Sequence, residues 1–189
     1  MSVHLVTGYA SKGHVTASDM GVYNSGLVGK GKYVLRTGNM FAAETISNNL
    51  IRIKDGDLIN QGRHINISVN DYEEVTIDNG LKSVKRNDLI AIRYRKNPET
   101  GVEKAEVVVI KGTSAETAVD PEYITGDILA GDTTDDFPLY RVCLDGLNIT
   151  AVEPLFSTIM PIKDIIDLVS SLNTNRSHIL QSLYPSYQA

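Results

Sequence analysis

Short runs of β-forming residues, separated by turn residues at close intervals, occupy the chain from Tyr33 to Lys111. The runs are rich in valine, isoleucine, threonine and tyrosine, and a turn residue follows about every eight to twelve positions, which is typical of a sandwich or a barrel. We therefore expect a mainly β fold, with an antiparallel sandwich or barrel-like domain over residues 33–157.

The clearest hairpin in this region joins residues 88–95 to residues 102–110. Both runs alternate in polarity, and Pro98 and Gly101 suit the loop between them. Asp78-Asn79-Gly80 predicts a second, tight turn, because Asn-Gly readily adopts positive φ values. Further turns are expected at Asp55-Gly56-Asp57 and at Asn70-Asp71.

The second half of the β domain is interrupted by a polar connector. Residues 111–136 are rich in glycine, threonine, serine and aspartate, and we expect them to run as an extended segment across a sheet. Residues 138–144 and 147–152 then predict a final pair of strands around Asp145-Gly146.

Residues 1–32 are expected to form an N-terminal arm with a short helix. Val3 to Val6 predict a small strand. Thr16 and Asp19 fit a capping box, although aspartate replaces the usual glutamate or glutamine, and a helix from Ala17 to Ser25 would end at Gly26.

Residues 158–189 are expected to form a C-terminal helical tail. Pro161 suits the first turn of a helix, and Asn173-Thr174-Asn175 are expected to interrupt it. Apolar residues recur at helical spacing, and Ile165, Leu168, Leu172 and Ile179 lie near heptad positions a and d. This apolar stripe either bundles with symmetry mates or packs on its own domain. The residues predicted for an oligomer interface are Ile162, Ile165, Leu168, Val169, Leu172 and Ile179.

Charge and hydropathy exclude several classes of partner. The net charge is −5 with no basic run, which disfavours nucleic acid because phosphate contacts need clustered lysine and arginine. No apolar stretch approaches the ~20 residues that span a bilayer, so we expect no membrane insertion. We also expect no signal peptide at the N-terminus. Cys143, the only cysteine, is interpreted as a small buried residue.

No motif in the sequence predicts catalysis, a metal or a cofactor. His4 and His14 flank a glycine-rich loop, but a zinc site needs more ligands than this pair supplies. Glu73-Glu74 and Asp135-Asp136 are adjacent on predicted strands, so the members of each pair point to opposite faces and do not converge. We therefore expect a protein that is not an enzyme, and a hydrolase is the least favoured of the functions considered.

Several phrases, in order, resemble a family of structural proteins from siphophages and prophages of Gram-positive hosts. They are HLVTGY (4–9), GHVTASD (13–19), GNMFAAE (38–44), DGDLINQGR (55–63), RNDLIAIRY (86–94), EVVVIKGT (106–113) and PLYRV (138–142). The resemblance extends over about residues 3–156 and lies in the ordered set rather than in any single phrase. It carries no catalytic motif.

The resemblance implies a virion component of the tail tip, baseplate or tail fibre that is made in the bacterial cytoplasm and supports host attachment. Its partners would be identical subunits, most often in trimers, and other tail or baseplate proteins. An alternative hypothesis is a carbohydrate-binding module that recognises host cell-wall glycan. Tyrosines supply nine of the chain's aromatic residues and tryptophan is absent, and Tyr33, Tyr72 and Tyr94 are the candidate glycan contacts.

Overall fold

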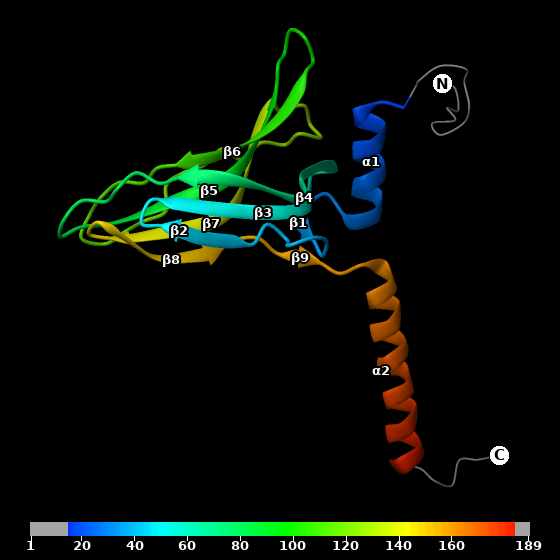
Figure 1. Ribbon diagram of the computed structural model, residues 1–189. Coiled ribbons are helices and arrows are strands. Elements are labelled where there is room, and N and C mark those ends of the chain that lie inside the picture. Colours follow the sequence, from blue (N-terminus) through cyan, green and yellow to red (C-terminus); the bar gives the residue numbers. More distant parts are fainter. Residues whose placement is uncertain (1–14, 184–189) are drawn as a thin grey trace. The chain divides into compact units, whose positions relative to one another are not determined.

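The computed structural model describes the backbone of residues 15–183 and the side chains of residues 15–176 (Figure 1). The chain divides into two units, one ending at Thr158 and the other beginning at Ile159. The elements are α1 (Ala17–Val28), β1 (Lys32–Leu35), β2 (Ala43–Ser47), β3 (Leu50–Asn60), β4 (Arg63–Thr76), β5 (Lys85–Lys96), β6 (Glu103–Ile110), β7 (Thr134–Asp145), β8 (Asn148–Pro154), β9 (Thr158–Ile159) and α2 (Ile162–Leu183). The predicted strand at Val3 to Val6, and both His4 and His14, lie outside the described residues.

Two sheets of antiparallel strands make up the β domain. One has the order β2-β3-β1-β9, with β4 paired to the other side of β3, and the second has the order β6-β5-β7-β8. Two short strands, β2 and β1, pair in succession with the long strand β3. Ile53 of β3 lies opposite Ala43 of β2, and Ile59 of β3 lies opposite Tyr33 of β1. The arrangement is sandwich-like, and the prediction of a mainly β fold with a helix near each end is confirmed.

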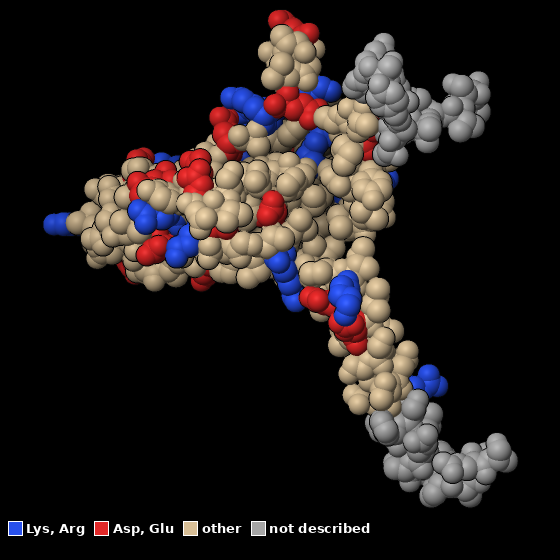
Figure 2. Space-filling view, turned by 45° about the vertical axis from the view of Figure 1, so that its right-hand side comes forward, with Lys and Arg blue, Asp and Glu red and all other residues tan. Residues whose placement is uncertain are grey.

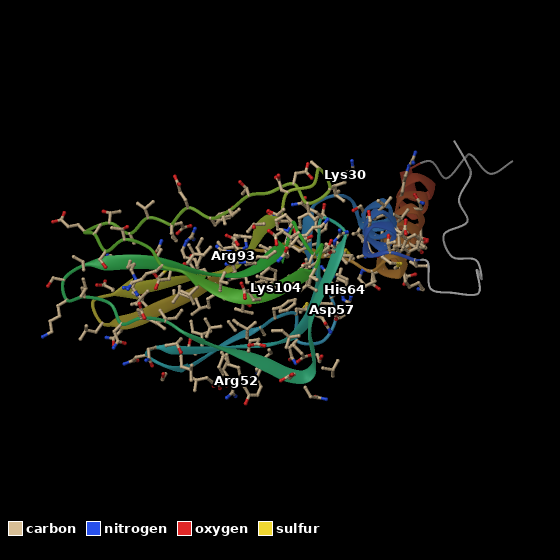
Figure 3. The ribbon with its side chains drawn as sticks, turned by 90° about the horizontal axis from the view of Figure 1, so that it is seen from above. Lys30, Arg52, Asp57, His64, Arg93 and Lys104 are labelled. Atoms are coloured by element: carbon tan, nitrogen blue, oxygen red, sulfur yellow. The ribbon has the colours of Figure 1, made fainter. Side chains whose placement is uncertain are left out.

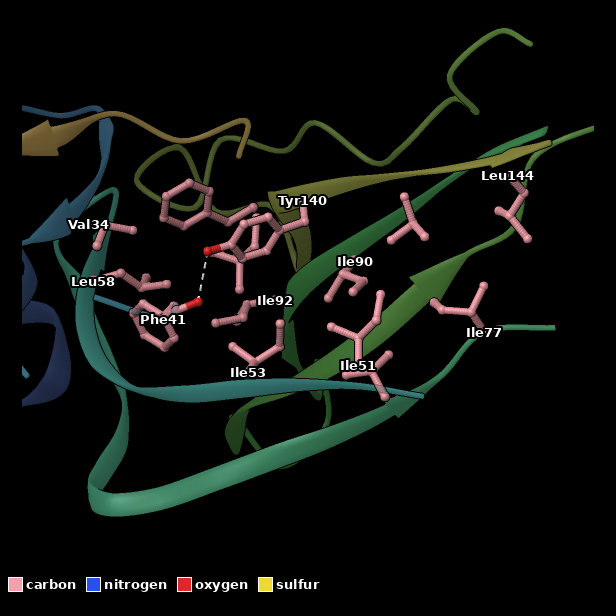
Figure 4. Packing of buried hydrophobic residues seen from close by; sticks show 14 residues of the cluster. Val34, Phe41, Ile51, Ile53, Leu58, Ile77, Ile90, Ile92, Tyr140 and Leu144 are labelled. Atoms are coloured by element: carbon pink, nitrogen blue, oxygen red, sulfur yellow. Dashed lines mark hydrogen bonds between the residues drawn. The ribbon is translucent and has the colours of Figure 1, made fainter. Parts of the chain in front are cut away.

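Side chains from both sheets fill a common hydrophobic core (Figure 4). Alternate residues of each strand point inward, so the period-2 pattern of the sequence becomes one apolar layer between the sheets. Tyr140 adds a polar anchor, because its hydroxyl donates a hydrogen bond of 3.0 Å to the carbonyl of Phe41. Residues with fully buried side chains include Val34, Phe41, Ile51, Ile53, Leu58 and Ile77 near the first sheet and Ile90, Leu139 and Val142 in the second.

Strand β5 is buried on both faces because the polar connector covers its outer side. Leu89 and Ala91 on that side are as inaccessible as Ile90 and Ile92 on the core side. Backbone amides of the connector hydrogen-bond to strand side chains, as where Gly112 N–H donates to Asp88 over 2.9 Å. The prediction that residues 111–136 lie extended across a sheet is thus confirmed up to β7, which begins at Thr134.

The turn predicted at Asp55-Gly56-Asp57 is wrong, since β3 continues through it with a bulge between Lys54 and Gly56. Gly56 is required there by close packing: a Cβ atom would lie 2.6 Å from the backbone nitrogen of Phe41. The glycine at position 56 therefore allows the backbone of Phe41 to pack closely against β3, and the chain does not reverse its direction there.

The tight hairpin predicted at Asn79-Gly80 is also wrong, because the flanking strands β4 and β5 belong to different sheets. Gly80 lies against another turn, where a Cβ atom would come within 1.9 Å of the Gly146 carbonyl oxygen. At Asn70-Asp71, β4 continues as one strand, although Asn70 adopts a positive φ of 66° beside a shift in register.

The two remaining hairpins form as predicted. Residues 88–95 pair with β6 through a loop that holds Gly101, and β7 pairs with β8 around Asp145-Gly146. The capping box of α1 is confirmed, but the helix passes Gly26 and ends at Val28. Helix α2 also runs without a break through residues 173–175, so the predicted interruption is wrong.

Candidate functional site

Helix α2 presents a row of large apolar side chains to solvent. The helix follows Pro161, whose carbonyl accepts the first helical bond from Ile165 N–H over 3.2 Å, and Asp164 lies in its first turn. Charge is confined to few positions: Lys163 pairs with Asp167 one turn later, and in residues 168–176 only Arg176 is charged (Figure 2). The exposed apolar residues are Ile162, Ile165, Ile166, Leu168, Val169 and Leu172, each between 43% and 59% accessible.

These residues fit a heptad repeat that begins at the first residue of α2. Counting Ile162 as position a places Val169 at the next a position and Ile165 and Leu172 at successive d positions. This register places Arg176 at the next a position, whereas a register with Leu168 at d places Asn175 at a core position. Ile179, the last of the predicted interface residues, lies beyond the described side chains.

The three tyrosines predicted to contact glycan lie in separate surroundings. Tyr33 is on β1, with its ring against Gly31. Tyr72, on β4, is 47% exposed and lies under the guanidinium of Arg52, 4.2 Å from the ring centre. Tyr94, on β5, is buried. No described contact joins any two of the three, so they do not form one binding surface.

A polar cluster surrounds the buried Tyr94 where β4, β5 and β6 meet. Arg63 makes a bidentate ion pair with Glu103, with both N–O distances 2.9 Å. Burial raises the pKa of Tyr94, and the neighbouring Glu103 carboxylate adds to this shift. The Tyr94 hydroxyl has no hydrogen-bond partner among the described residues. Because Arg63 also donates to the Ala17 carbonyl, the cluster fastens the start of α1 to the sheet.

An aspartate–histidine pair lies beside this cluster (Figure 3). His64 Nε2 is 2.8 Å from Asp57 Oδ1, and Thr37 donates to the other carboxylate oxygen over 2.7 Å. The bond from Thr37 is the main reason that the pKa of Asp57 lies below its ordinary value. Asp57 thus joins β1's neighbouring segment at Thr37 to His64 of β4 through its two carboxylate oxygens.

The adjacent carboxylates Asp135 and Asp136 have different partners, as predicted. Asp135 accepts hydrogen bonds from Lys32, Asn60 and the Gly126 amide. Asp136 accepts two from Arg93 and one from the Ile124 amide. Burial alone would raise the pKa of Asp136, but these hydrogen bonds outweigh it and hold the pKa below its ordinary value. Both carboxylates thus tie the connector to the sheets.

Metal ligands and reactive thiols do not gather in the described part of the chain. No group of three or more histidine, cysteine, aspartate or glutamate residues has the geometry to hold a metal ion there. Cys143 is half-buried, and burial raises the pKa of its thiol, which lowers its reactivity at neutral pH. No helix in residues 15–183 is long and apolar enough to cross a membrane.

One groove in the β domain was not predicted from the sequence. It has a volume of about 350 Å³ and includes Tyr123 of the connector and Phe156 of the segment between β8 and β9. Neither residue lies in a motif, and only the fold brings these two segments together.

Comparison with known protein families and curated proteins found no relative of this chain. No model of a known protein family matches the chain, and no curated protein is significantly similar to it.

Proposed function

We propose that this protein is a non-enzymatic structural subunit of a bacteriophage or prophage tail tip or baseplate. In this proposal it acts as a homo-oligomer that supports attachment to the host. The observation that carries the proposal is the exposed apolar face of α2, formed by Ile162, Ile165, Val169 and Leu172. A contiguous apolar surface of this kind marks an interaction site. The ordered phrases shared with siphophage structural proteins support the virion setting.

The face of α2 favours association with identical helices. Positions a and d of the register that begins at Ile162 are filled by isoleucine, valine and leucine, as in the seam of a coiled coil. In the heptad that begins at Ile162, isoleucine fills both a and d, which favours trimers or tetramers, whereas Val169 at a with Leu172 at d favours dimers. Arg176 falls at the third a position, and a single polar residue there helps to fix register at some cost in stability. The seam supports a helical bundle, and the trimer that we propose follows from the resemblance to tail-fibre and baseplate proteins.

The oligomer is tested by the solution mass of the full chain, measured by light scattering. A trimer should have three times the monomer mass of 20.7 kDa. Leu172→Asp places a charge in the proposed seam and should shift the mass toward that of the monomer. The matched control is Ser170→Asp, which adds the same charge at position b and should leave the trimer intact.

Truncation provides a second test, provided that the β domain is kept whole. The chain should end at Met160, because β9 at Thr158–Ile159 is a strand of the first sheet. We expect this shortened chain to be monomeric. If the full chain and Leu172→Asp are both monomers at high concentration, the assembly proposal fails.

The virion setting is tested separately from the oligomer. An antibody raised against the β domain should label one end of the tail in electron micrographs of purified particles. Absence of the chain from purified virions would refute the proposed location, whatever its oligomeric state.

A further inference from the structure

A groove on the β domain combines exposed apolar side chains with two charged groups that are held in place. The connector forms one wall, and β1, β5, β7 and the segment between β8 and β9 contribute the rest. The residues that carry the argument are Lys32, Asp120, Tyr123, Pro138, Leu155 and Phe156. Its volume of about 350 Å³ lies near the lower end of the range for small-molecule sites.

The apolar part of the groove consists of rings and a leucine. Tyr123 is 43% exposed and Leu155 is 38% exposed, although both are large apolar side chains. Phe156 is fixed beside them, because its ring packs edge-to-face on Tyr140 with centroids 5.7 Å apart. A ligand therefore meets an apolar surface of which Phe156 is a fixed part.

The polar part consists of the Lys32 ammonium group and the Asp120 carboxylate. Both groups already make most of the hydrogen bonds that they can form. Lys32 has three N–H donors, of which Asp135 Oδ1 and the Asp136 carbonyl each take one over 2.7 Å. Asp120 accepts two hydrogen bonds from Arg141 and one from Asn87, out of about four that a carboxylate can accept. Each group thus has about one position left for a ligand.

Both groups remain accessible while their orientation is fixed. The Lys32 side chain is 26% exposed and the Asp120 side chain is 34% exposed. The bond from Arg141 is the main reason that the pKa of Asp120 lies below its ordinary value, so the carboxylate is charged at neutral pH. An anionic ligand would be repelled by Asp120 and a cationic one by Lys32. The pair instead suits a neutral group that both accepts and donates hydrogen bonds.

We propose that this groove binds a neutral polyhydroxylated ring, such as one pyranose unit of a glycan. The C–H face of a pyranose would lie on Tyr123 and Leu155, and neighbouring hydroxyls would accept from Lys32 and donate to Asp120. The site lies within residues 32–157, so it does not depend on the assembly proposed for α2. It is also distinct from the surroundings of Tyr33, Tyr72 and Tyr94.

The absence of tryptophan from the chain allows a direct binding assay. Tyr123→Trp places a single fluorophore in the groove and enlarges its aromatic face. We expect its emission to change saturably with methyl glucoside or N-acetylglucosamine, with a dissociation constant on the order of 1 mM for so small a ligand. Adding Asp120→Asn should raise that constant about tenfold, which corresponds to one lost hydrogen bond. The urea midpoint checks that this double variant folds.

The control fluorophore is Tyr23→Trp, since Tyr23 is also exposed but lies on α1. Its emission should not respond to either sugar. In the unaltered protein, amide resonances of Phe156 and Ser157 should shift during the same titrations, and Tyr123→Ala should abolish these shifts. Two flat titrations, of Tyr123→Trp fluorescence and of these amides, would overturn the proposal.

The two proposals fail separately. A monomeric Leu172→Asp chain should keep its sugar response, and Tyr123→Ala should keep the mass of the full chain. A sugar response that disappears in the monomeric variant would also contradict the site as proposed, because all of its residues belong to one chain.

Discussion

At the residue scale, Arg86 and Asp88 form an ion pair with almost no solvent exposure. The guanidinium donates to both carboxylate oxygens over 2.8 Å and also to the carbonyls of Asp78 and Asn79. Asp88 accepts a further bond from the Gly112 amide. These bonds compensate the loss of hydration that burial imposes on two charges.

We predict that Arg86→Met lowers the free energy of unfolding by about 3–5 kcal/mol, because the Asp88 carboxylate remains buried without its counter-ion. Urea denaturation measures the change. Arg95→Met, on the same strand but in an exposed pair with Glu106, is the matched control and should change stability by at most about 1 kcal/mol. Equal losses in the two variants would show that burial of this pair has no energetic consequence.

Single residues also explain where the sequence misled. Asn79-Gly80 has the composition of a tight hairpin, and Gly56 lies between two aspartates as in a turn. Both glycines are instead required by contacts with distant backbone, at Gly146 and at Phe41. A local pattern identifies a need for glycine, but the reason for it here depends on tertiary packing that the pattern does not contain.

At the scale of elements, patterns with a local cause were the most informative. The capping box predicted the start of α1 because its hydrogen bonds join residues only three apart: Asp19 N–H donates to Thr16 Oγ1, and Thr16 N–H donates to Asp19. The hairpin of β5 and β6 was predicted because each strand alternates in polarity and a short loop with Pro98 and Gly101 joins them. The end of α1 and the continuity of α2 through Asn173 were not predicted correctly. The helix propensity of a single residue only weakly determines where a helix ends.

We predict that Thr16→Ala destabilises the first turn of α1 by about 1 kcal/mol, because its backbone amides lose their side-chain acceptor. Hydrogen exchange of the Asp19 amide should quicken correspondingly, while amides of β5 should keep their rates. Ser18→Ala, an exposed change within the same turn, is the control and should leave exchange near its original rate. A slowed Asp19 amide in Thr16→Ala would contradict the role of the cap.

The candidate sites were only partly predictable at this scale. The apolar stripe of α2 was visible in the sequence because helical spacing is local, and the structure places it at the surface. The groove at Tyr123 was not predicted, since its lining comes from separate segments between Lys32 and Ser157, which no periodicity links.

At the scale of the whole molecule, hydrogen-bonded carboxylates make the stability of the fold depend on pH. The pKa values of Asp57, Asp120 and Asp136 all lie below the ordinary value of about 3.9 for aspartate. A carboxyl group whose pKa is depressed by folding contributes stability above its unfolded pKa. That contribution is lost as the pH falls through the folded pKa.

We therefore predict that the urea midpoint is steady near neutral pH and falls as the pH is lowered from about 5 toward 2. Asp136→Asn should be less stable at pH 7 and should show a shallower acid dependence, because the titrating group is gone. The control is Asp78→Asn: the pKa of Asp78 is lowered by its bond to Lys111, but its side chain is exposed and the effect should be small. A steeper acid dependence in Asp136→Asn would refute this assignment.

The polar connector that lies over β5 affects the tendency of the chain to aggregate. Beneath it, Leu89-Ile90-Ala91-Ile92 forms an uncharged run of high β-propensity, the kind of segment that seeds intermolecular sheets when uncovered. Unfastening the connector, by a protease cut near Tyr123 or by loss of its bonds to Asp135 and Asp136, would expose the outer face of this run, Leu89 and Ala91, to other chains. The connector, although it has little regular secondary structure, thereby protects the domain against aggregation.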